Sequence, residues 1–347
     1  MRFSQIIGND SLKHLLPQMV DQNRLSHAIL FSEEPGCGGL PYALALAQYV
    51  NCRDRHDGDS CGKCPSCYKY EKLIHPDLHF VFPVNTSDII SETEKKRPIS
   101  DYFLPKWREM LLANPYLTEQ DLYDGIGIDN KSGNISVFEA KRIIEKLSLR
   151  SFEGEYKTMI IWLPEKMNQE AANKLLKLLE EPPAGTLFLL VSQAPERLLP
   201  TIRSRCQLIE LAPLTKEERA SMVQFAQPRE FNPLLIELFN AGLNRDLQAT
   251  FPVWESVADL GREKQRQFCL EAETFIRKIY MVANGLQQLS NVGNDEADEI
   301  QTLARKINPA FYKKGFGYFE KALSAIDSNV NAKLIFCDLC NRLLLSL

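Results

Sequence analysis

The amino-acid sequence predicts an α/β domain built on a parallel sheet, followed by a C-terminal part that is entirely helical. Up to about Leu211, short apolar runs of strand length alternate with amphipathic helical stretches. This alternation is typical of a doubly wound parallel sheet, whose strands are buried on both faces. After Pro213 the strand signals fade, and apolar residues recur with the 3.6-residue period of helices.

Four apolar runs are expected to form buried strands, because each has strand length and is bounded by polar or turn-forming residues. They occupy residues 28–31, 78–82, 158–163 and 187–191. Between the last two runs, residues 169–181 are rich in helix formers, and Pro182 and Pro183 end that helix. These elements predict a sheet domain that extends over residues 1–213.

Residues 85–134 interrupt the alternation. They are polar and charged and contain only short helical candidates, at residues 102–112 and 118–123. We interpret them as an insertion in the sheet domain, whose aromatic side chains dock either on the core or on a partner. These aromatic residues are Tyr102, Phe103, Trp107, Tyr116 and Tyr123.

The C-terminal part is predicted to contain a small helical domain at residues 214–255 and a helical bundle at residues 256–347. Cys337 and Cys340 lie in a predicted helix and are interpreted as packing residues, since no second cysteine pair is near them in the sequence. Helical periodicity is found at residues 215–226, 233–241, 263–284 and 333–347.

Composition argues against several classes of protein. The chain has 347 residues, of which 44% are hydrophobic and 25% charged, as in globular proteins and unlike collagenous or disordered chains. A formal charge of −4 cannot make the whole surface bind nucleic acid, so phosphate binding would need a local basic patch or a larger assembly. The N-terminus has no apolar signal segment, so we expect a cytoplasmic protein without a membrane partner.

Four of the nine cysteines, Cys52, Cys61, Cys64 and Cys67, are clustered with the spacing Cys-x8-Cys-x2-Cys-x2-Cys. Four thiolates complete a tetrahedral shell for Zn²⁺ and leave no position for a reactive water. The sequence therefore predicts one structural zinc ion per chain. The alternative, four thiols in an apolar core, is disfavoured by the polar residues around them. His56 is a second candidate ligand in the same loop.

Basic residues surround the cysteine cluster. They could contact nucleic acid or a partner protein, as in a free-standing zinc-dependent nucleic-acid binder, but a solvated charged surface is the simpler explanation. These residues are Arg53, Arg55, Lys63, Lys69 and Lys72.

A glycine-rich turn follows the first predicted strand and leads into a helix, as in the phosphate loop G-x-x-x-x-G-K-[ST] of nucleotide-binding proteins. Gly36 and Gly38 match the turn. Glu33, however, replaces the first glycine, Gly39 replaces the lysine that reaches the phosphates, and Leu40 replaces the hydroxyl that holds Mg²⁺. Such a loop is not expected to bind ATP tightly.

The third predicted strand also lacks a residue that ATP hydrolysis requires. It ends in Trp162, Leu163 and Pro164, so the aspartate that would hold Mg²⁺ at the strand tip is missing. Glu165 comes too late to replace it. The losses of lysine, hydroxyl and acid favour a protein without intrinsic ATPase activity. An active ATPase with an unusual phosphate loop is the alternative.

Several segments resemble the bacterial DNA polymerase III clamp loader, a family of AAA+ proteins. They are RLSHAILFSEEPGCGG at residues 24–39, AANKLLKLLEEPP at residues 171–183, IRSRC at residues 202–206 and the four-cysteine insert. Because the phosphate loop is degenerate, the sequence is most similar to the delta-prime branch of this family. The resemblance implies an AAA+ core, a helical lid at residues 214–255 and a C-terminal collar bundle at residues 256–347.

The resemblance also implies a role and partners. The chain would be a non-catalytic stator in a ring with delta and gamma/tau-like ATPase subunits, which loads the sliding clamp on primed-template DNA during replication. Ser204 and Arg205 match the family's Ser-Arg-Cys motif. Its arginine acts in trans, as an arginine finger, on ATP bound to the neighbouring subunit. An ordinary salt bridge is the alternative for Arg205. Ser192 matches the family's sensor position.

Overall fold

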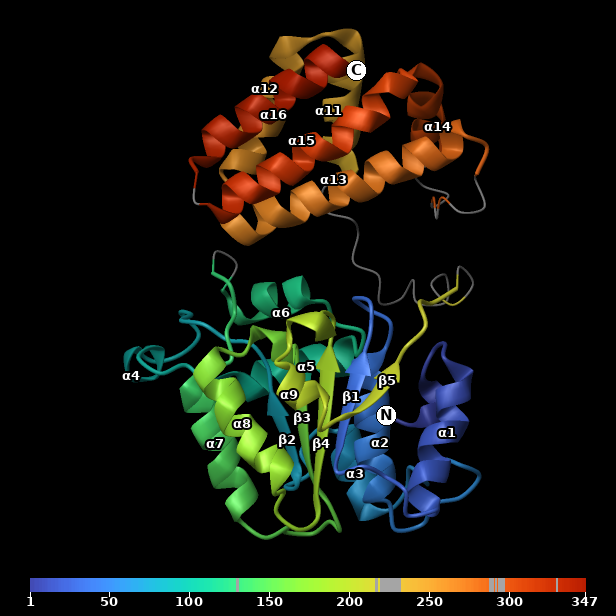
Figure 1. Cartoon of the computed structure of the whole chain (residues 1–347), viewed down its shortest axis with the longest axis vertical. Coiled ribbons are helices and arrows are strands. Elements are labelled where there is room, and N and C mark those ends of the chain that lie inside the picture. The colour runs from blue at the N-terminus through green and yellow to red at the C-terminus, as the bar shows by residue number, and fades with distance from the viewer. Residues whose placement is uncertain are drawn as a thin grey trace. The chain divides into compact units, whose positions relative to one another are not determined.

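The chain forms two compact units that divide near residue 226. Figure 1 shows a sheet flanked by helices in the first unit and helices alone in the second. The predicted α/β class and the predicted helical C-terminal part are both confirmed. The computed structural model describes residues 1–128, 131–215, 218, 232–286, 290, 292, 297–328 and 330–347.

Five parallel strands form the sheet, in the order β2-β3-β4-β1-β5. They are β1 (Ala28–Ser32), β2 (Leu78–Val81), β3 (Lys157–Trp162), β4 (Thr186–Ser192) and β5 (Gln207–Glu210). Phe31 of β1 lies opposite Val191 of β4, and Ile29 of β1 lies opposite Gln207 of β5. Because the strands are parallel, their carboxyl ends meet at one edge, which is where open α/β sheets bind ligands.

The strand β5 is not evident from the sequence. It lies at the edge of the sheet, and its burial pattern shows one buried residue, Ile209, between exposed ones. A strand of this kind has no continuous apolar run, and such runs identified the other four strands.

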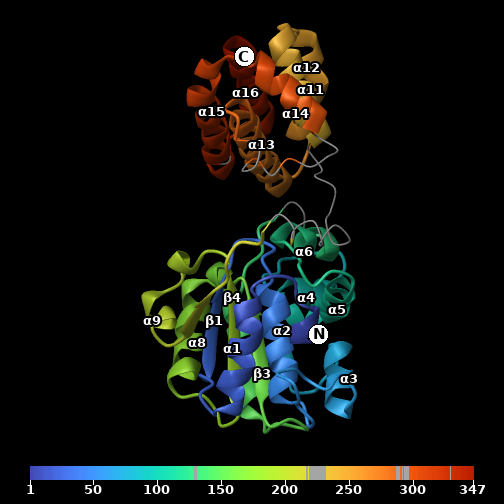
Figure 2. The same cartoon turned by 90° about the vertical axis from the view of Figure 1, so that its right-hand side faces the viewer.

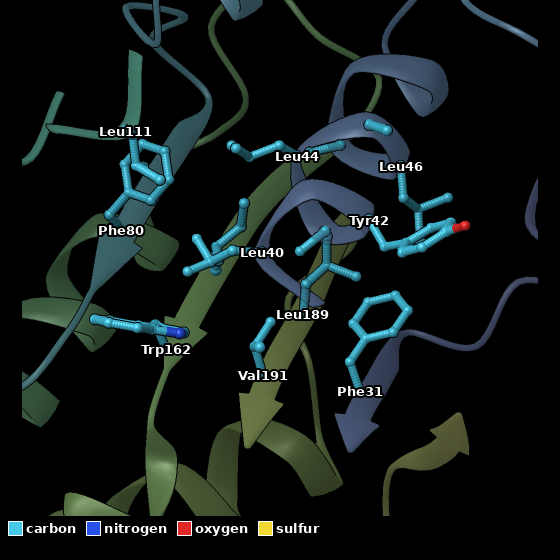
Figure 3. Packing of buried hydrophobic residues seen from close by; sticks show 14 of the residues in the cluster. Phe31, Leu40, Tyr42, Leu44, Leu46, Phe80, Leu111, Trp162, Leu189 and Val191 are labelled. Atoms are coloured by element: carbon cyan, nitrogen blue, oxygen red, sulfur yellow. The ribbon is translucent and has the colours of Figure 1, made fainter. Parts of the chain in front are cut away.

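Helices cover both faces of the sheet (Figures 1 and 2). They are α1 (Asp10–Asp21), α2 (Gly39–Val50), α3 (Pro65–Glu71), α7 (Val137–Ser148), α8 (Gln169–Glu180) and α9 (Pro200–Arg203). On one face, Leu189, Val191 and Trp162 of the sheet pack with Leu40 and Leu44 of α2, as Figure 3 shows. Strand side chains that point to the opposite face pack with α7 and α8.

The described part of the insertion packs on the core of the first unit. Its helices are α4 (Glu92–Lys95), α5 (Leu104–Ala113) and α6 (Glu119–Ile126). Trp107 of α5 is fully buried; its ring centroid lies 4.2 Å from that of Phe82 and 5.4 Å from that of Trp162. Most aromatic residues of the insertion therefore dock on the core, and Tyr102 is the partly exposed one. The other buried members are Phe103, Tyr116 and Tyr123.

Helices of the second unit share one apolar cluster, in which the ring of Phe239 lies 5.4 Å from Phe275 and 5.8 Å from Phe311. The helices are α11 (Asn232–Asn244), α12 (Leu247–Ala258), α13 (Arg262–Ala283), α14 (Ala297–Lys306), α15 (Pro309–Asp327) and α16 (Ala332–Ser346). The predicted helix at residues 215–226 lies almost entirely outside the described residues. The division of this region into lid and collar stays a prediction. Among the described helices, none has the length and apolar character needed to cross a membrane.

Candidate functional site

The glycine-rich turn lies between β1 and α2, at the carboxyl edge of the sheet. Gly36 and Gly38 have φ angles of +79° and +103°, which residues with a side chain rarely adopt. Gly38 is the N-cap residue of α2, so the unpaired backbone N–H groups of the first helical turn face the loop. A glycine-rich turn that leads into a helix N-terminus is the arrangement that binds phosphate in many proteins.

The carboxylate of Glu33 occupies this helix N-terminus. The backbone N–H of Gly39 donates a hydrogen bond of 2.6 Å to Oε2 of Glu33, and Glu33 is only 7% exposed. The helix dipole favours a carboxylate here in the same way as it favours a bound phosphate. The chain therefore places its own acidic side chain at the position that a nucleotide phosphate would take.

Gly39 and Glu33 depend on each other sterically. A Cβ atom built on Gly39 would lie 2.7 Å from Cγ1 of Val191 and 2.9 Å from Cδ of Glu33, which is closer than real Cβ atoms come to their neighbours. A lysine at position 39 would therefore displace the carboxylate. Glu33 and Gly39 both depart from the phosphate-loop pattern, and the two departures depend on each other. The sequence alone does not show this dependence.

Glu165, which follows the tip of β3, contacts Ser192 and Gln193 at the end of β4. Its Oε2 accepts a hydrogen bond of 2.8 Å from the hydroxyl of Ser192, and its Oε1 accepts one of 3.0 Å from the N–H of Gln193. Ser192 is fully buried, and its carbonyl oxygen accepts a hydrogen bond from the N–H of Glu33. The hydroxyl of Ser192, the residue predicted to be a sensor, is thus bonded to a side chain of its own chain.

Burial makes Glu33 a source of pH-dependent stability. It raises the pKa of the Glu33 carboxyl from 4.5 to about 7; the N–H groups of Gly39 and Gly38 oppose this rise, and the nearby Glu165 adds to it. Since the folded pKa is the higher one, the contribution of Glu33 to stability is present below pH 4.5 and is lost as the pH rises through 7. Glu33→Gln keeps an acceptor for the N–H of Gly39 but cannot ionise.

We expect the difference in the free energy of unfolding between Glu33→Gln and the wild type to change in favour of Glu33→Gln by about 2 to 3 kcal/mol as the pH rises from about 5 to 8. Urea unfolding at a series of pH values measures this difference. Burial also raises the pKa of Glu139 to about 7, but this slope is common to both proteins and cancels. A difference that does not change with pH would contradict the assignment of a buried Glu33 carboxyl with a raised pKa.

The four clustered cysteines converge in the structure. Their Sγ atoms all lie within 4.8 Å of one another, and those of Cys61 and Cys67 are 3.9 Å apart. Sulfur atoms around a tetrahedral zinc ion, with bonds of about 2.3 Å, stand about 3.8 Å apart, so this spacing fits a bound metal ion. Cys52 follows α2, and Cys64 is the N-cap residue of α3. The group could therefore hold a metal ion.

Backbone N–H groups point at these sulfur atoms. Those of Lys63 and Cys64 donate to Sγ of Cys61 over 3.4 and 3.3 Å, and that of Cys67 donates to Sγ of Cys64 over 3.4 Å. Burial raises the pKa of Cys52 and of Cys67. Burial also opposes ionisation of Cys64, but the N–H groups of Arg53 and Cys67, together with the side chains of Cys67 and Cys61, outweigh it and lower its pKa to about 7. Hydrogen bonds of this kind favour the thiolate, which is the form that binds a metal.

The cysteine loop is fastened to the beginning of the chain. The two carboxylate oxygens of Asp59 accept hydrogen bonds of 3.0 Å from the N–H groups of Phe3 and Ser4. His56, the second candidate ligand, is exposed and lies outside the group of four sulfur atoms. A metal ion in the cluster would therefore order both the loop and its contact with the N-terminal segment.

Arg205 lies between α9 and β5, with its guanidinium folded back on α8. Its Nη2 is 2.5 Å from Oε1 of Glu180, and its Nη1 donates a hydrogen bond of 2.9 Å to the carbonyl oxygen of Thr201. The hydroxyl of Ser204, which is exposed, donates to the same carbonyl oxygen over 3.1 Å. The pairing with Glu180 has no signal in the sequence, because it depends on how α8 packs beside α9.

Arg205 lies near the amino ends of the parallel strands, whereas the phosphate loop lies at their carboxyl ends. Gln207, the first residue of β5, is in register with Ile29, whereas Glu33 follows the far end of β1. The levels of Ile29 and Glu33 differ by about 13 Å along the strand, at about 3.3 Å per residue. Arg205 lies further back, so its guanidinium cannot reach the phosphate loop of its own chain.

Comparison with known proteins identifies relatives of this chain. A sequence model of the family "DNA polymerase III, delta subunit" matches residues 8–215. DNA polymerase III subunit delta′ of Bacillus subtilis is 32% identical over 200 residues, which cover 58% of this chain and 46% of that protein. The subunit delta′ of Escherichia coli is 31% identical over 189 residues, which cover 54% and 42%. The chain spans about half the length of these curated relatives.

A solved structure of a gamma subunit-related protein of DNA polymerase III from Thermotoga maritima aligns with 96% of this chain and 99% of its own, with a TM-score of 0.44 and 18% identity. The matched residues 8–215 make up more than half of the chain and contain the phosphate loop, the cysteine cluster, the insertion and Arg205. Relatives named delta′ confirm the predicted relationship. The chain therefore belongs to the DNA polymerase III delta subunit family.

Proposed function

We propose that the chain is a non-catalytic, delta-prime-type subunit of a bacterial clamp loader. In this role it occupies an AAA+ ring with delta and gamma/tau-like ATPase subunits and acts as a stator. The ring loads the sliding clamp on primed-template DNA. Family membership and the relatives named delta′ support the place in replication.

The observation that carries the non-catalytic role is the position of Glu33. Its carboxylate accepts the N–H of Gly39 at the helix N-terminus, where ATP phosphates would need the same donor. Neither a lysine nor a hydroxyl ligand for Mg²⁺ is available in the loop, and β3 ends in Trp162. In such a loop the ionised form of Glu33 repels a triphosphate, and no lysine or Mg²⁺ ion balances the negative charge of the phosphates.

The position of Arg205 supports a role in trans. It lies near the amino ends of the strands, away from its own phosphate loop at their carboxyl ends, and its side chain is 34% exposed. An arginine finger stabilises the charge that develops on the transferred phosphoryl group, and it can come from a neighbouring subunit. Arg205, with Ser204 beside it, would complete the active site of the adjacent ATPase subunit.

The cysteine cluster supports a structural zinc ion held by Cys52, Cys61, Cys64 and Cys67. With four sulfur ligands the ion has no open position, so it supplies no Lewis-acid or water-activating chemistry. Its contribution would be to fold a polar loop that has almost no apolar core of its own.

The chain alone is not expected to bind ATP. Titration with a fluorescent ATP analogue, with and without Mg²⁺, should show no saturable signal at micromolar concentrations. A phosphate loop with its lysine and Mg²⁺ ligand would give such a signal. Micromolar, Mg²⁺-dependent binding would contradict the stator role and favour an active ATPase with an unusual phosphate loop.

The test of the partners is assembly. Mixing the chain with delta and gamma/tau-like subunits from the same organism should give one discrete complex in size-exclusion chromatography with light scattering. The same experiment with primed DNA and the sliding clamp shows whether the complex loads the clamp. Failure to enter any complex would contradict the role of ring subunit.

A further inference from the structure

Tyr116 of the insertion lies directly against the phosphate loop. A Cβ atom built on Gly38 would lie 3.2 Å from Cε1 of Tyr116. The hydroxyl of Tyr116 accepts a hydrogen bond of 2.8 Å from the backbone N–H of Ile7, and Tyr116 is only 5% exposed. The side chain therefore reaches from the N-cap of α2 to the N-terminal segment of the chain.

The turn before α6 holds Tyr116 in this position. The N–H of Tyr116 donates a hydrogen bond of 2.9 Å to the side-chain oxygen of Asn114. Thr118 and Asp121 form a capping box, which fixes the beginning of α6 two residues later. Leu117, next to Tyr116, is buried in the apolar cluster that also contains α2. Hydrogen bonds, the helix cap and the packing of Leu117 thus hold the backbone that carries the ring.

The helices of the insertion are fastened to the same edge of the sheet as the phosphate loop. Lys166, just after the tip of β3, forms an ion pair with Glu119 of α6, and the hydroxyl of Tyr123 donates to the same carboxylate over 2.5 Å. Trp107 of α5 packs on Trp162, the last residue of β3. These contacts tie Tyr116 to the strand that would carry the Mg²⁺ ligand in an ATPase.

We propose that the described part of the insertion is a built-in closure of the degenerate nucleotide site, in which Tyr116 excludes ligands from the phosphate loop. The inference rests on the proposed function and deepens it, because it gives a cause for the weak nucleotide binding that this function predicts. Glu33 takes the anion position at Gly39, and Tyr116 covers the loop at Gly38. Side chains of the chain itself thus take the place of a ligand that would otherwise order the loop.

The test is to repair the loop with and without Tyr116. The repaired chain carries Glu33→Gly, Gly39→Lys and Leu40→Thr, which restore the pattern of a phosphate loop. We expect Tyr116→Ala in this background to raise the affinity for a fluorescent ATP analogue with Mg²⁺ by at least about tenfold. Tyr102→Ala, a partly exposed tyrosine of the insertion, is the matched control and should leave the affinity unchanged.

Equal affinity of the repaired chain with and without Tyr116, including no binding by either, would overturn the proposal. Tight binding by the unaltered chain would instead overturn the proposed function, so the two failures are distinguishable. Circular dichroism and melting temperatures show whether each variant folds.

A second measurement uses the unaltered loop and requires no repair. In the full chain, Tyr116→Phe removes the acceptor for the N–H of Ile7 but keeps the ring, whereas Tyr116→Ala removes both. Hydrogen exchange followed by mass spectrometry should show faster exchange at residues 6–8 in both variants. Exchange at residues 36–40 should increase in Tyr116→Ala only. Unchanged exchange of both segments in Tyr116→Ala would show that Tyr116 does not close the loop.

Discussion

Arg205→Ala in a reconstituted clamp loader is expected to lower ATP turnover at the neighbouring ATPase site by about 10³-fold, the lower end of the range for arginine fingers. The lost guanidinium stabilises charge that develops only in the transition state, so kcat should fall while KM for ATP changes little. DNA-stimulated phosphate release, measured in a loader whose other ATPase sites are inactivated, reports the effect. Sites that receive a finger from another subunit keep their activity.

Glu180→Gln separates this role from the alternative of an ordinary salt bridge. Both substitutions break the ion pair between Arg205 and Glu180, but only Arg205→Ala removes the guanidinium. The pair is 34% and 48% exposed and is worth at most about 1 kcal/mol, so swinging Arg205 away from Glu180 toward a neighbour costs little. We expect Glu180→Gln to change turnover by less than about fivefold.

Arg203→Ala is a second control, because Arg203 is exposed and lies two residues from Arg205. All three variants should enter the complex as the wild type does, as size-exclusion chromatography would show. Equal turnover in Arg205→Ala and Glu180→Gln would assign Arg205 to the salt bridge and remove the arginine finger from the proposed function.

The fold could be predicted from the sequence where burial is continuous. The strands β1, β3 and β4 are buried along nearly their whole length, and their apolar runs are plain in the sequence. The edge strand β5 could not be predicted, because most of its residues are exposed and form no apolar run. The docking of the insertion on the core could not be predicted from the sequence, because most of its residues are polar. The contact depends on a few buried aromatic side chains, above all Trp107.

The candidate site was predicted only in part, for a similar reason. The four cysteines lie within 16 residues, from Cys52 to Cys67, so the sequence itself predicts that they lie close together. The degenerate phosphate loop was evident as a list of departures, but not as an arrangement in which Gly39 makes room for Glu33. Tyr116 and the pairing of Arg205 with Glu180 depend on packing between distant segments, which no local pattern records.

Removal of the predicted zinc ion is expected to unfold residues 52–67, because it lowers the local free energy of unfolding by on the order of 10 kcal/mol. Apart from their sulfur atoms, these residues offer almost no apolar core, since the local cluster consists of the four cysteines. Cys64→Ser removes one ligand. Cys337→Ser is the matched control, because Cys337 is also half-buried and also belongs to a Cys-x2-Cys pair.

Atomic absorption should find about one zinc ion per chain in the wild type and in Cys337→Ser, and much less in Cys64→Ser. Hydrogen exchange locates the consequence: protection should be lost in the cysteine loop and at Phe3 and Ser4, whose N–H groups bond to Asp59 of that loop. The strands should keep their protection, because their cores do not include the loop. If the metal-free loop stays protected and its thiols stay unreactive, the hydrogen bonds of Asp59 suffice to hold it, and the structural role assigned to the zinc ion is wrong.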